Sequence, residues 1–193
     1  MSQKKENRMN THLRPICLAI LASVFVFWTA GPAGSQPAQV SLGFTLPVPE
    51  SPETRAYLGL DTQDRFTLDD VDADILIVEI FSMYCPICQR EAPRVNALYE
   101  KLNAVTNKTV RLIGIGAGNS AYEVNFFKET YTIPFPLFSD GDFAIHKTIG
   151  EQGTPFFIAL VPGAAKGQQI FFTHSGDIGD LDQFFERLTT PTN

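Results

Sequence analysis

The hydrophobic pattern of the chain alternates between continuous apolar runs and helical spacing. Residues 75–81 (ILIVEIF) form a run rich in β-branched residues, which is typical of a strand covered on both faces. Residues 86–104 then carry apolar side chains every three or four positions, as expected of a helix with one buried face. Residues 110–115 form a second run of the buried-strand type. The central part of the chain is therefore predicted to be strand, helix and strand.

The C-terminal half continues this alternation and then pairs two neighbouring strands. Asn119 or Ser120 is suited to cap the next helix, because either side chain can accept a hydrogen bond from a free backbone N–H. The elements expected after it are a loop at 133–142, a short helix at 143–149, strands at 156–161 and 170–174, and a last helix at 181–188. This order predicts an α/β fold with a mixed central sheet flanked by helices on both sides.

The region before the first buried strand has a different pattern. Short alternating segments at 56–60 and 65–68, separated by turn-forming residues 61–64, predict an N-terminal β-hairpin extension of the fold. Residues 36–53 are rich in proline and predict an extended linker without a helix. The folded domain is therefore expected to span residues 54–193.

The first 35 residues have the layout of an export signal. Residues 1–14 are polar and basic, and residues 16–30 form an uncharged apolar run that small residues follow. This run is shorter than the roughly 20 residues that span a bilayer, which favours a cleaved signal; an uncleaved inner-membrane anchor is the alternative. Cys17 lies in the run and is interpreted as a small apolar residue. Residues 1–35 thus predict export to the periplasm.

Composition limits the size of the protein and its partners. A chain of 193 residues, of which 44% are hydrophobic, is long enough for one domain with its own core. The formal net charge is −6, and the part after residue 35 is more acidic still. Nucleic-acid binding depends on Lys and Arg side chains that neutralise phosphates, so this charge balance argues against a nucleic-acid partner.

Cys85 and Cys88, the cysteines of the predicted exported part, form a CxxC motif (CPIC). The motif falls where the first buried strand gives way to a helix, so Cys85 is expected at the helix start with Pro86 in the first turn. Free N–H groups at a helix start favour a thiolate and lower the pKa of Cys85. Cys88 lies one turn further on, within reach of a mixed disulfide at Cys85, and is predicted to release it. The pair is expected to alternate between two thiols and a Cys85–Cys88 disulfide.

Two structural interpretations of the motif are weaker. A lone CxxC disulfide closes a very short loop and gains little stability from chain entropy. A zinc site needs four ligands, whereas His146 and His174, the histidines that follow the signal segment, are distant from the motif and lack paired spacing. The motif therefore predicts redox chemistry that uses neither a metal nor an organic cofactor.

Glu79 interrupts the apolar run at 75–81, and two interpretations stay open. A buried Glu79 would have a raised pKa and could exchange protons with a nearby thiol, whereas on an edge strand it would face solvent. Thr154-Pro155 precedes the strand at 156–161, where a proline is tolerated. This dipeptide is either a simple turn or, if the bond is cis, part of the site.

Three segments together resemble the thioredoxin superfamily, most closely the exported TlpA-like redoxins. They are residues 79–88 (EIFSMYCPIC), 91–93 (EAP) and 153–157 (GTPFF). The resemblance spans about residues 56–188 and implies a thioredoxin-like fold with extra N-terminal strands. It implies that Cys85 attacks, that Cys88 resolves, that Pro155 is a cis proline beside the site and that Glu79 is a buried acid. The residues expected to contact substrate are Tyr84, Pro86, Thr154 and Pro155.

The resemblance also implies a function, a thiol–disulfide oxidoreductase of the bacterial cell envelope. Exported proteins with disulfides or thiols would be its clients, and a membrane or periplasmic redox protein would recycle it. The Pro-Ile dipeptide between the cysteines lacks the histidine of strong periplasmic oxidants, which favours a reductant. One alternative is a peroxidase of the peroxiredoxin type, since residues 82–85 (SMYC) match its S/T-x-x-C, although Val78 stands where its proline would be. The other alternative is a non-catalytic binding module on the same fold.

Overall fold

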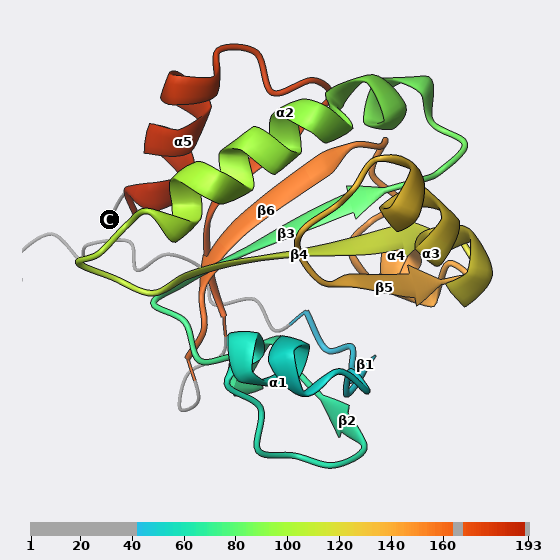
Figure 1. The fold of residues 1–193 in the computed structure, drawn as a ribbon, viewed down its shortest axis with the longest axis horizontal. Helices are drawn as coiled ribbons and strands as arrows, with labels where there is room; N and C mark the ends of the chain where they lie inside the picture. Colours follow the sequence, from blue (N-terminus) through green and yellow to red (C-terminus); the bar gives the residue numbers. More distant parts are fainter. Residues whose placement is uncertain (1–41, 164–167, 192–193) are drawn as a thin grey trace, which may run out of the picture. The chain divides into compact units, whose positions relative to one another are not determined.

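The computed structural model describes residues 42–163 and 168–191, and a mixed sheet forms its centre (Figure 1). Across the sheet the strands are β5 (Leu137–Asp140), β4 (Val110–Ala117), β3 (Ile75–Phe81), β6 (Phe156–Val161) and β7 (Gln169–Ser175). β3, β4 and β5 run parallel, and β6 and β7 are antiparallel to their neighbours. The parallel strands end at the same edge, at the right of Figure 1, where the chain leaves β3 toward the cysteines.

Helices cover both faces of this sheet, as predicted. α2 (Pro86–Asn103), α3 (Ala121–Thr130) and α5 (Leu181–Thr189) contribute to the apolar core on one face. Residues 42–71 and α4 (Ala144–Thr148) contribute to the core on the other face. The sheet is therefore buried on both sides, which explains the continuous apolar sequences of its central strands.

β3 is the central strand, and its alternation decides where Glu79 points. Successive side chains of a strand face opposite sides of the sheet. Ile77 and Phe81 belong to the core beneath α2, whereas Val78 belongs to the core on the opposite face. Glu79 has the parity of Ile77 and Phe81, so its carboxyl is directed at the face that α2 covers.

A two-stranded extension precedes the sheet, as predicted, although its first strand lies elsewhere. β1 (Leu46–Pro47) pairs antiparallel with β2 (Arg65–Phe66). The sequence predicts a linker for residues 36–53, yet Leu42 and Leu46 are buried in the core of the domain. The folded part therefore begins earlier in the chain than predicted.

Residues 56–60 were expected to be a strand, and this prediction is wrong because they lie in and after a helix. α1 (Pro52–Leu58) begins where the Ser51 hydroxyl accepts a hydrogen bond from the N–H of Thr54 at 3.2 Å. The helix ends at Gly59, whose left-handed φ of 66° suits a residue without a side chain. Capping at both ends thus defines a helix of seven residues, too short for its periodicity to be recognised.

The segment 133–142, predicted to be a loop, contains the edge strand β5. It pairs with β4 from Leu137, opposite Gly114, onward. The carbonyl of Pro136 accepts the N–H of Gly114 at 2.9 Å just before this pairing begins. Proline is compatible with an edge strand, because one side of the strand needs no ladder hydrogen bond.

The other predicted elements are confirmed with small shifts at their ends. Ser120, rather than Asn119, caps α3, since its hydroxyl accepts the N–H of Glu123 at 3.4 Å. The Glu123 carboxylate accepts the N–H of Ser120 at 2.7 Å in return, which completes a capping box. The start of α3 is thereby fixed at the edge of the sheet where the parallel strands end.

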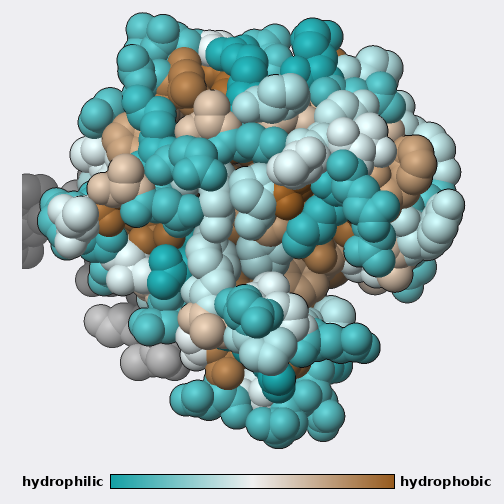
Figure 2. All heavy atoms as spheres, viewed as in Figure 1, coloured by the Kyte–Doolittle hydropathy of each residue, from teal (hydrophilic) through white to brown (hydrophobic). Residues whose placement is uncertain are grey.

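The predicted signal segment, residues 1–35 with Cys17, lies outside the described residues. Within residues 42–163 and 168–191, no helix combines the length and the apolar character that crossing a bilayer requires. On the face shown in Figure 2, hydrophilic side chains cover most of the surface and apolar ones show in separate patches.

Candidate active site

Cys85 occupies the position before the first residue of α2. Its backbone is extended, with φ −82° and ψ 116°, and Pro86 takes the first helical position, as predicted. The N–H of Cys85 donates to the carbonyl of Ser82 at 3.0 Å, which closes a tight turn after β3. Cys85 is partly exposed and Cys88 is buried, and both are free thiols. The fold therefore presents one sulfur to solvent and covers the other.

Hydrogen bonds favour the thiolate of Cys85. Partial burial by itself raises the pKa of this thiol. Hydrogen bonds from the Thr154 side chain and from the backbone N–H groups of Cys88 and Ile87 outweigh burial, so the pKa of Cys85 lies below its ordinary value. The N–H of Cys88 lies 3.4 Å from Cys85 Sγ. The donors expected from the start of a helix are thus identified individually.

Cys88 has the opposite tendency, because burial raises its pKa far above the ordinary value. Its hydrogen bond with Cys85 and the negative charge of Glu79 raise the pKa further, while a hydrogen bond from the Ser82 backbone lowers it. Of the two thiols, Cys85 therefore ionises first. This order matches the roles that the sequence predicts for an attacking and a resolving cysteine.

Glu79 is buried, with 6% of its surface exposed, so the interpretation of a solvent-facing edge residue is wrong. Its neighbours in the sheet are Gly114 on β4 and Phe157 on β6. Burial raises the pKa of Glu79 to about 8, and the negative charge of Cys85 contributes in the same direction. The carboxyl therefore carries its proton at neutral pH while lying close enough to the cysteines to interact with their charges.

The loop before β6 lies directly against Cys85. The peptide bond between Thr154 and Pro155 is cis, as the resemblance implies. In its protonated form the Cys85 thiol donates a hydrogen bond to the carbonyl oxygen of Thr154 at 3.1 Å, a bond distinct from those that favour the thiolate. The carbonyl of Pro155 accepts the N–H of Gly176 at 2.8 Å, which ties this loop to the chain after β7. Two segments about 70 residues apart thus meet at one sulfur.

Tyr84 and Pro86, the other predicted contact residues, flank Cys85 at the surface. Tyr84 is 65% exposed, and Pro86 is exposed as well. The Tyr84 hydroxyl donates a hydrogen bond to the carboxylate of Glu123 on α3. The structure therefore brings all the predicted site residues to the edge of the sheet where β3 ends.

Glu91 is a second buried carboxylate near the motif, and the sequence indicates it only through the EAP segment. It is 3% exposed. Its carboxylate accepts hydrogen bonds from Arg94 at 3.1 Å and from the N–H of Ile178 at 3.3 Å. Arg94 also donates to the carbonyl of Gly179. These bonds fasten α2 to the loop between β7 and α5, and Gly176 at the start of that loop donates to the carbonyl of the cis Pro155.

Asn119 supports the turn that leads to the cysteines, a role that the sequence does not reveal. The side chain is fully buried. Its Oδ1 accepts the N–H of Met83 at 2.8 Å, and its Nδ2 donates to the hydroxyl of Ser82 at 3.4 Å. Because these partners lie 36 and 37 positions away in the chain, no local pattern links them. The sequence suggests Asn119 only as a helix cap, the role that Ser120 takes.

Replacing Asn119 with alanine is expected to lower the free energy of unfolding by about 1 to 3 kcal/mol, because the part-buried N–H of Met83 loses its acceptor. The alkylation rate of Cys85 is expected to change as well, since the turn before it loses its support. Denaturant unfolding and iodoacetamide kinetics measure the two effects. Asn125→Ala, at an exposed position of α3, is the matched control. If Asn119→Ala unfolded with its midpoint at the same denaturant concentration as the wild-type protein, the proposed role of Asn119 would be contradicted.

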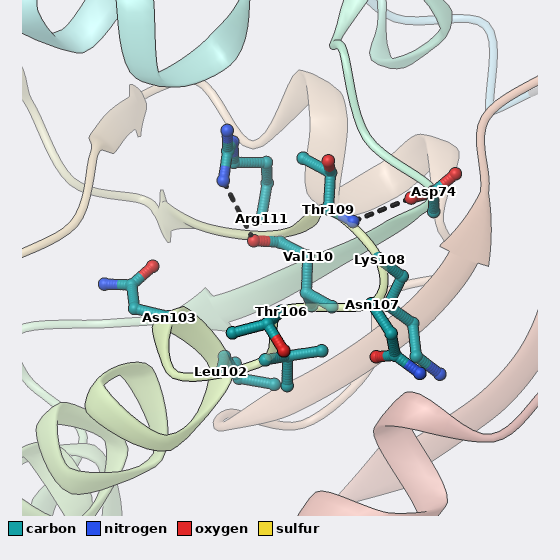
Figure 3. A pocket seen from close by; sticks show the side chains of 10 residues that line it. Asp74, Leu102, Asn103, Thr106, Asn107, Lys108, Thr109, Val110 and Arg111 are labelled. Carbon is teal, nitrogen blue, oxygen red and sulfur yellow. Dashed lines mark hydrogen bonds between the residues drawn. The ribbon is translucent and has the colours of Figure 1, made fainter.

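A cavity of about 410 Å³ lies at the other end of β3 and β4 (Figure 3). Its lining comes from Asp74 and from residues 102, 103 and 105–111, between the end of α2 and the start of β4. The carboxylate of Asp74 accepts the N–H of Thr109 at 2.7 Å. None of the predicted site residues lines this cavity, so the candidate chemistry stays with the cysteines.

A mixed sheet, two cysteines at the start of a helix and a cis proline against the first of them define a thioredoxin-like fold with a redox-type site. The chain belongs to the AhpC/TSA family, whose family model matches residues 44–173. It is accordingly an oxidoreductase of the redoxin class. A comparison with curated protein sequences finds no match.

Solved structures share the fold at low sequence identity. A secreted disulfide oxidoreductase of Mycobacterium tuberculosis, homologous to E. coli DsbE, has 16% identity and a TM-score of 0.53, over 76% of this chain and 95% of that one. StoA from Bacillus subtilis has 19% identity and a TM-score of 0.52, over 79% and 97%. A thiol:disulfide interchange protein of the thioredoxin family from Chlorobium tepidum has 15% identity and a TM-score of 0.56, over 81% and 97%. These likenesses confirm the predicted fold.

Proposed function

We propose that the protein is a thiol–disulfide oxidoreductase of the bacterial cell envelope that exchanges disulfides with exported proteins. The observation that carries this proposal is the contrast between the two sulfurs. Cys85 is partly exposed, with a pKa below its ordinary value, while Cys88 is buried one turn behind it, with a raised pKa. An accessible thiolate backed by a covered second thiol suits exchange with a disulfide on a large partner.

In the proposed cycle the Cys85 thiolate attacks one sulfur of a client disulfide. The other client sulfur leaves as a thiolate and takes up a proton, and a mixed disulfide joins the client to Cys85. Cys88 then loses its proton and attacks Cys85 Sγ. This attack forms the Cys85–Cys88 disulfide and releases the client sulfur that was bound to Cys85, which takes up a proton. The client gains two electrons and the protein loses two.

Glu79 is proposed to exchange the proton of Cys88. A thiol with a strongly raised pKa needs a base at the moment of its attack, and a carboxyl with a pKa of about 8 is poised between its two forms near neutral pH. A water molecule would carry the proton between the two groups. In this scheme Glu79 exchanges a proton with Cys88 only, and Cys85 stays accessible to the client.

The protein is proposed to act as a reductant rather than as an oxidant. A strong oxidant owes its potential to extra stabilisation of its reduced form, in particular of the thiolate. Between the two cysteines stand Pro86 and Ile87, neither of which can donate a side-chain hydrogen bond to Cys85. Equilibration with dithiothreitol buffers measures the reduction potential of the Cys85–Cys88 couple. A strong oxidant has a potential of about −120 mV, and a similar value here would contradict the proposed role as a reductant.

The periplasm is the proposed location, because the basic and apolar pattern of residues 1–35 is that of an export signal. In that compartment a membrane or periplasmic redox partner would reduce the Cys85–Cys88 disulfide after each cycle. Thr154, Pro155, Tyr84 and Pro86 are proposed to contact the client. Tyr84 and Pro86 are exposed on either side of Cys85, and Thr154 lies against its sulfur with the buried Pro155 next to it.

The proposed function is tested by combining alkylation with a disulfide assay. The rate of Cys85 alkylation by iodoacetamide is expected to reach half its maximum at a pH below the about 8.5 of a free cysteine, because hydrogen bonds favour the thiolate. The reduced protein is expected to release thiols from a peptide disulfide in a stoichiometric first turnover. Peptide mapping assigns the alkylated position.

Peroxide is the control substrate in this assay. The hydroxyl of Ser82 in the S/T-x-x-C match accepts a hydrogen bond from Asn119, a structural use of that side chain. Rapid oxidation of Cys85 by hydrogen peroxide, together with no thiol release from the peptide, would favour the peroxidase instead. Failure of both reactions would favour a binding module.

A further inference from the structure

The exposed large apolar side chains of residues 42–163 and 168–191 are confined to one region. They are Tyr84, Tyr122, Phe126 and Phe143, which are 65, 78, 50 and 44% exposed. Tyr84 follows the end of β3, Tyr122 and Phe126 lie in the helix after β4, and Phe143 follows β5. We call these four side chains the aromatic rim. The segments that carry them, the turn after β3, α3 and the turn after β5, lie at the right of Figure 1, on the side where β3 ends.

Tyr84 links the rim to α3. Its hydroxyl donates to the carboxylate of Glu123, which stands between Tyr122 and Phe126 in the helix. Side chains four positions apart lie on the same face of a helix, so Tyr122 and Phe126 form a pair on the surface. The rim therefore extends from the residue that precedes Cys85 onto the outer face of α3.

Phe143 is held at the surface in an unfavourable backbone conformation. Its φ of 59° is left-handed, which is costly for a bulky residue. Its ring lies on Gly118, where an added Cβ would collide with the ring. Gly118 adjoins Asn119, the residue that supports the turn before Cys85. The Phe143 ring is thus kept half-exposed close to Asn119.

The rim also carries a defined charge. Glu123 and Glu129 are the acids on α3, and its one cation, Lys128, is half-buried. The hydrogen bond from Tyr84 holds the pKa of Glu123 below its ordinary value, so this carboxylate stays ionised beside the aromatic rings. Burying one aromatic side chain stabilises a complex by about 1.5 to 3 kcal/mol, and exposed apolar patches mark binding sites.

We infer that the aromatic rim binds an extended client segment that carries an aromatic or large aliphatic side chain and a basic side chain next to its cysteine. This inference rests on the proposed function and narrows its substrate class. The rim is continuous with Cys85 through Tyr84, so a segment lying on it has its cysteine at the reactive sulfur. The carboxylate of Glu123 pairs with the basic group.

Two peptides with one internal disulfide each test this inference. In one peptide the first cysteine is flanked by Phe and Arg, and in the other by two serines. The reduced protein is expected to reduce the Phe–Arg peptide with about a 10-fold higher kcat/KM, because one aromatic side chain becomes partly buried. In the double variant Tyr122→Ser/Phe126→Ser this preference is expected to disappear. Asn125→Ser, on the same helix, is the matched control and is expected to keep it.

Glutathione disulfide measures the intrinsic reactivity of the thiols, and its rate is expected to be the same in all variants. Equal rates of the wild-type protein with both peptides would overturn the inference and leave the proposed function standing. Exchange with neither peptide would overturn the proposed function itself. Dimer formation that Tyr122→Ser/Phe126→Ser abolishes would assign the rim to a second copy of the chain, which also overturns the inference. The comparison of the two peptides uses the wild-type protein, so it does not depend on whether a variant folds.

Discussion

Replacing Cys88 with serine is expected to turn the protein from a catalyst with turnover into a trap for its clients. Cys85 keeps the Thr154 side chain beside it and the backbone N–H groups at the start of α2, so it still forms a thiolate. The buried sulfur that would resolve the mixed disulfide is missing, so the adduct persists. Incubation of the reduced variant with a peptide disulfide, followed by non-reducing electrophoresis and peptide mapping, measures the adduct at Cys85.

Cys85→Ser is the matched variant, and its effect is expected to be complete. A serine hydroxyl is not ionised near neutral pH, so the first attack is expected to slow by on the order of 10³-fold or more. No adduct should form at Cys88, because this thiol is buried and its pKa is raised. Peptide mapping also separates these sites from Cys17. Turnover by Cys88→Ser at the wild-type rate, or adducts at Cys88 in Cys85→Ser, would contradict the division of roles.

The chemistry of the site was predictable because it is encoded locally. Cys85, Pro86 and Cys88 lie within four positions, and the change from a continuous apolar run to helical spacing marks where they fall. The polar interruption of the same run singles out Glu79. Whether this side chain is buried depends on the pairing of β3 with β4 and β6, and strands far apart in the sequence decide that.

Two elements, α1 and β5, could not be predicted from the sequence, because helix caps define the first and pairing with a distant strand defines the second. α1 is fixed by Ser51 and Gly59 at its two ends, and a run of prolines before it resembles a linker. β5 is an edge strand of four residues preceded by two prolines, and only β4 beside it makes it a strand. Neither element has the length that makes hydrophobic periodicity informative.

The supporting residues of the site were missed for the same reason. Asn119 reaches Met83 across 36 positions, and Glu91 reaches Ile178 across 87. A buried polar side chain is informative only when its partner is known, because an unpaired one would be costly. In the sequence Asn119 is one residue of a loop and Glu91 one residue of a helix. The fold gives each of them its partner.

Two buried carboxylates, Glu91 in α2 and Glu79 in β3 beneath it, show how neighbouring groups determine the cost of burying a charge. Glu91 faces Arg94 and a backbone N–H, so its charge is compensated. Glu79 lies between the apolar residues of β3, and the groups that act on it include Cys85, whose charge has the same sign. Burial of an uncompensated carboxylate is costly, so the protein is expected to be more stable while Glu79 is protonated.

The stability of the wild-type protein is therefore expected to fall as the pH rises from about 5 to about 8, and Glu79→Gln is expected to remove much of this fall. The pKa of Glu79 is about 8 in the folded protein, against 4.5 for the ordinary carboxyl, so in this window the folded state holds a proton that the unfolded state has lost. Linkage at about 1.4 kcal/mol per pH unit limits the effect to roughly 3 to 5 kcal/mol. Denaturant unfolding of the reduced protein at several pH values measures the slope. Glu100→Gln is the control, because it removes the same charge from an exposed position of α2, and it is expected to keep the wild-type slope. If Glu79→Gln also kept the wild-type slope, the Glu79 carboxyl would be ionised in the folded protein, which contradicts the prediction.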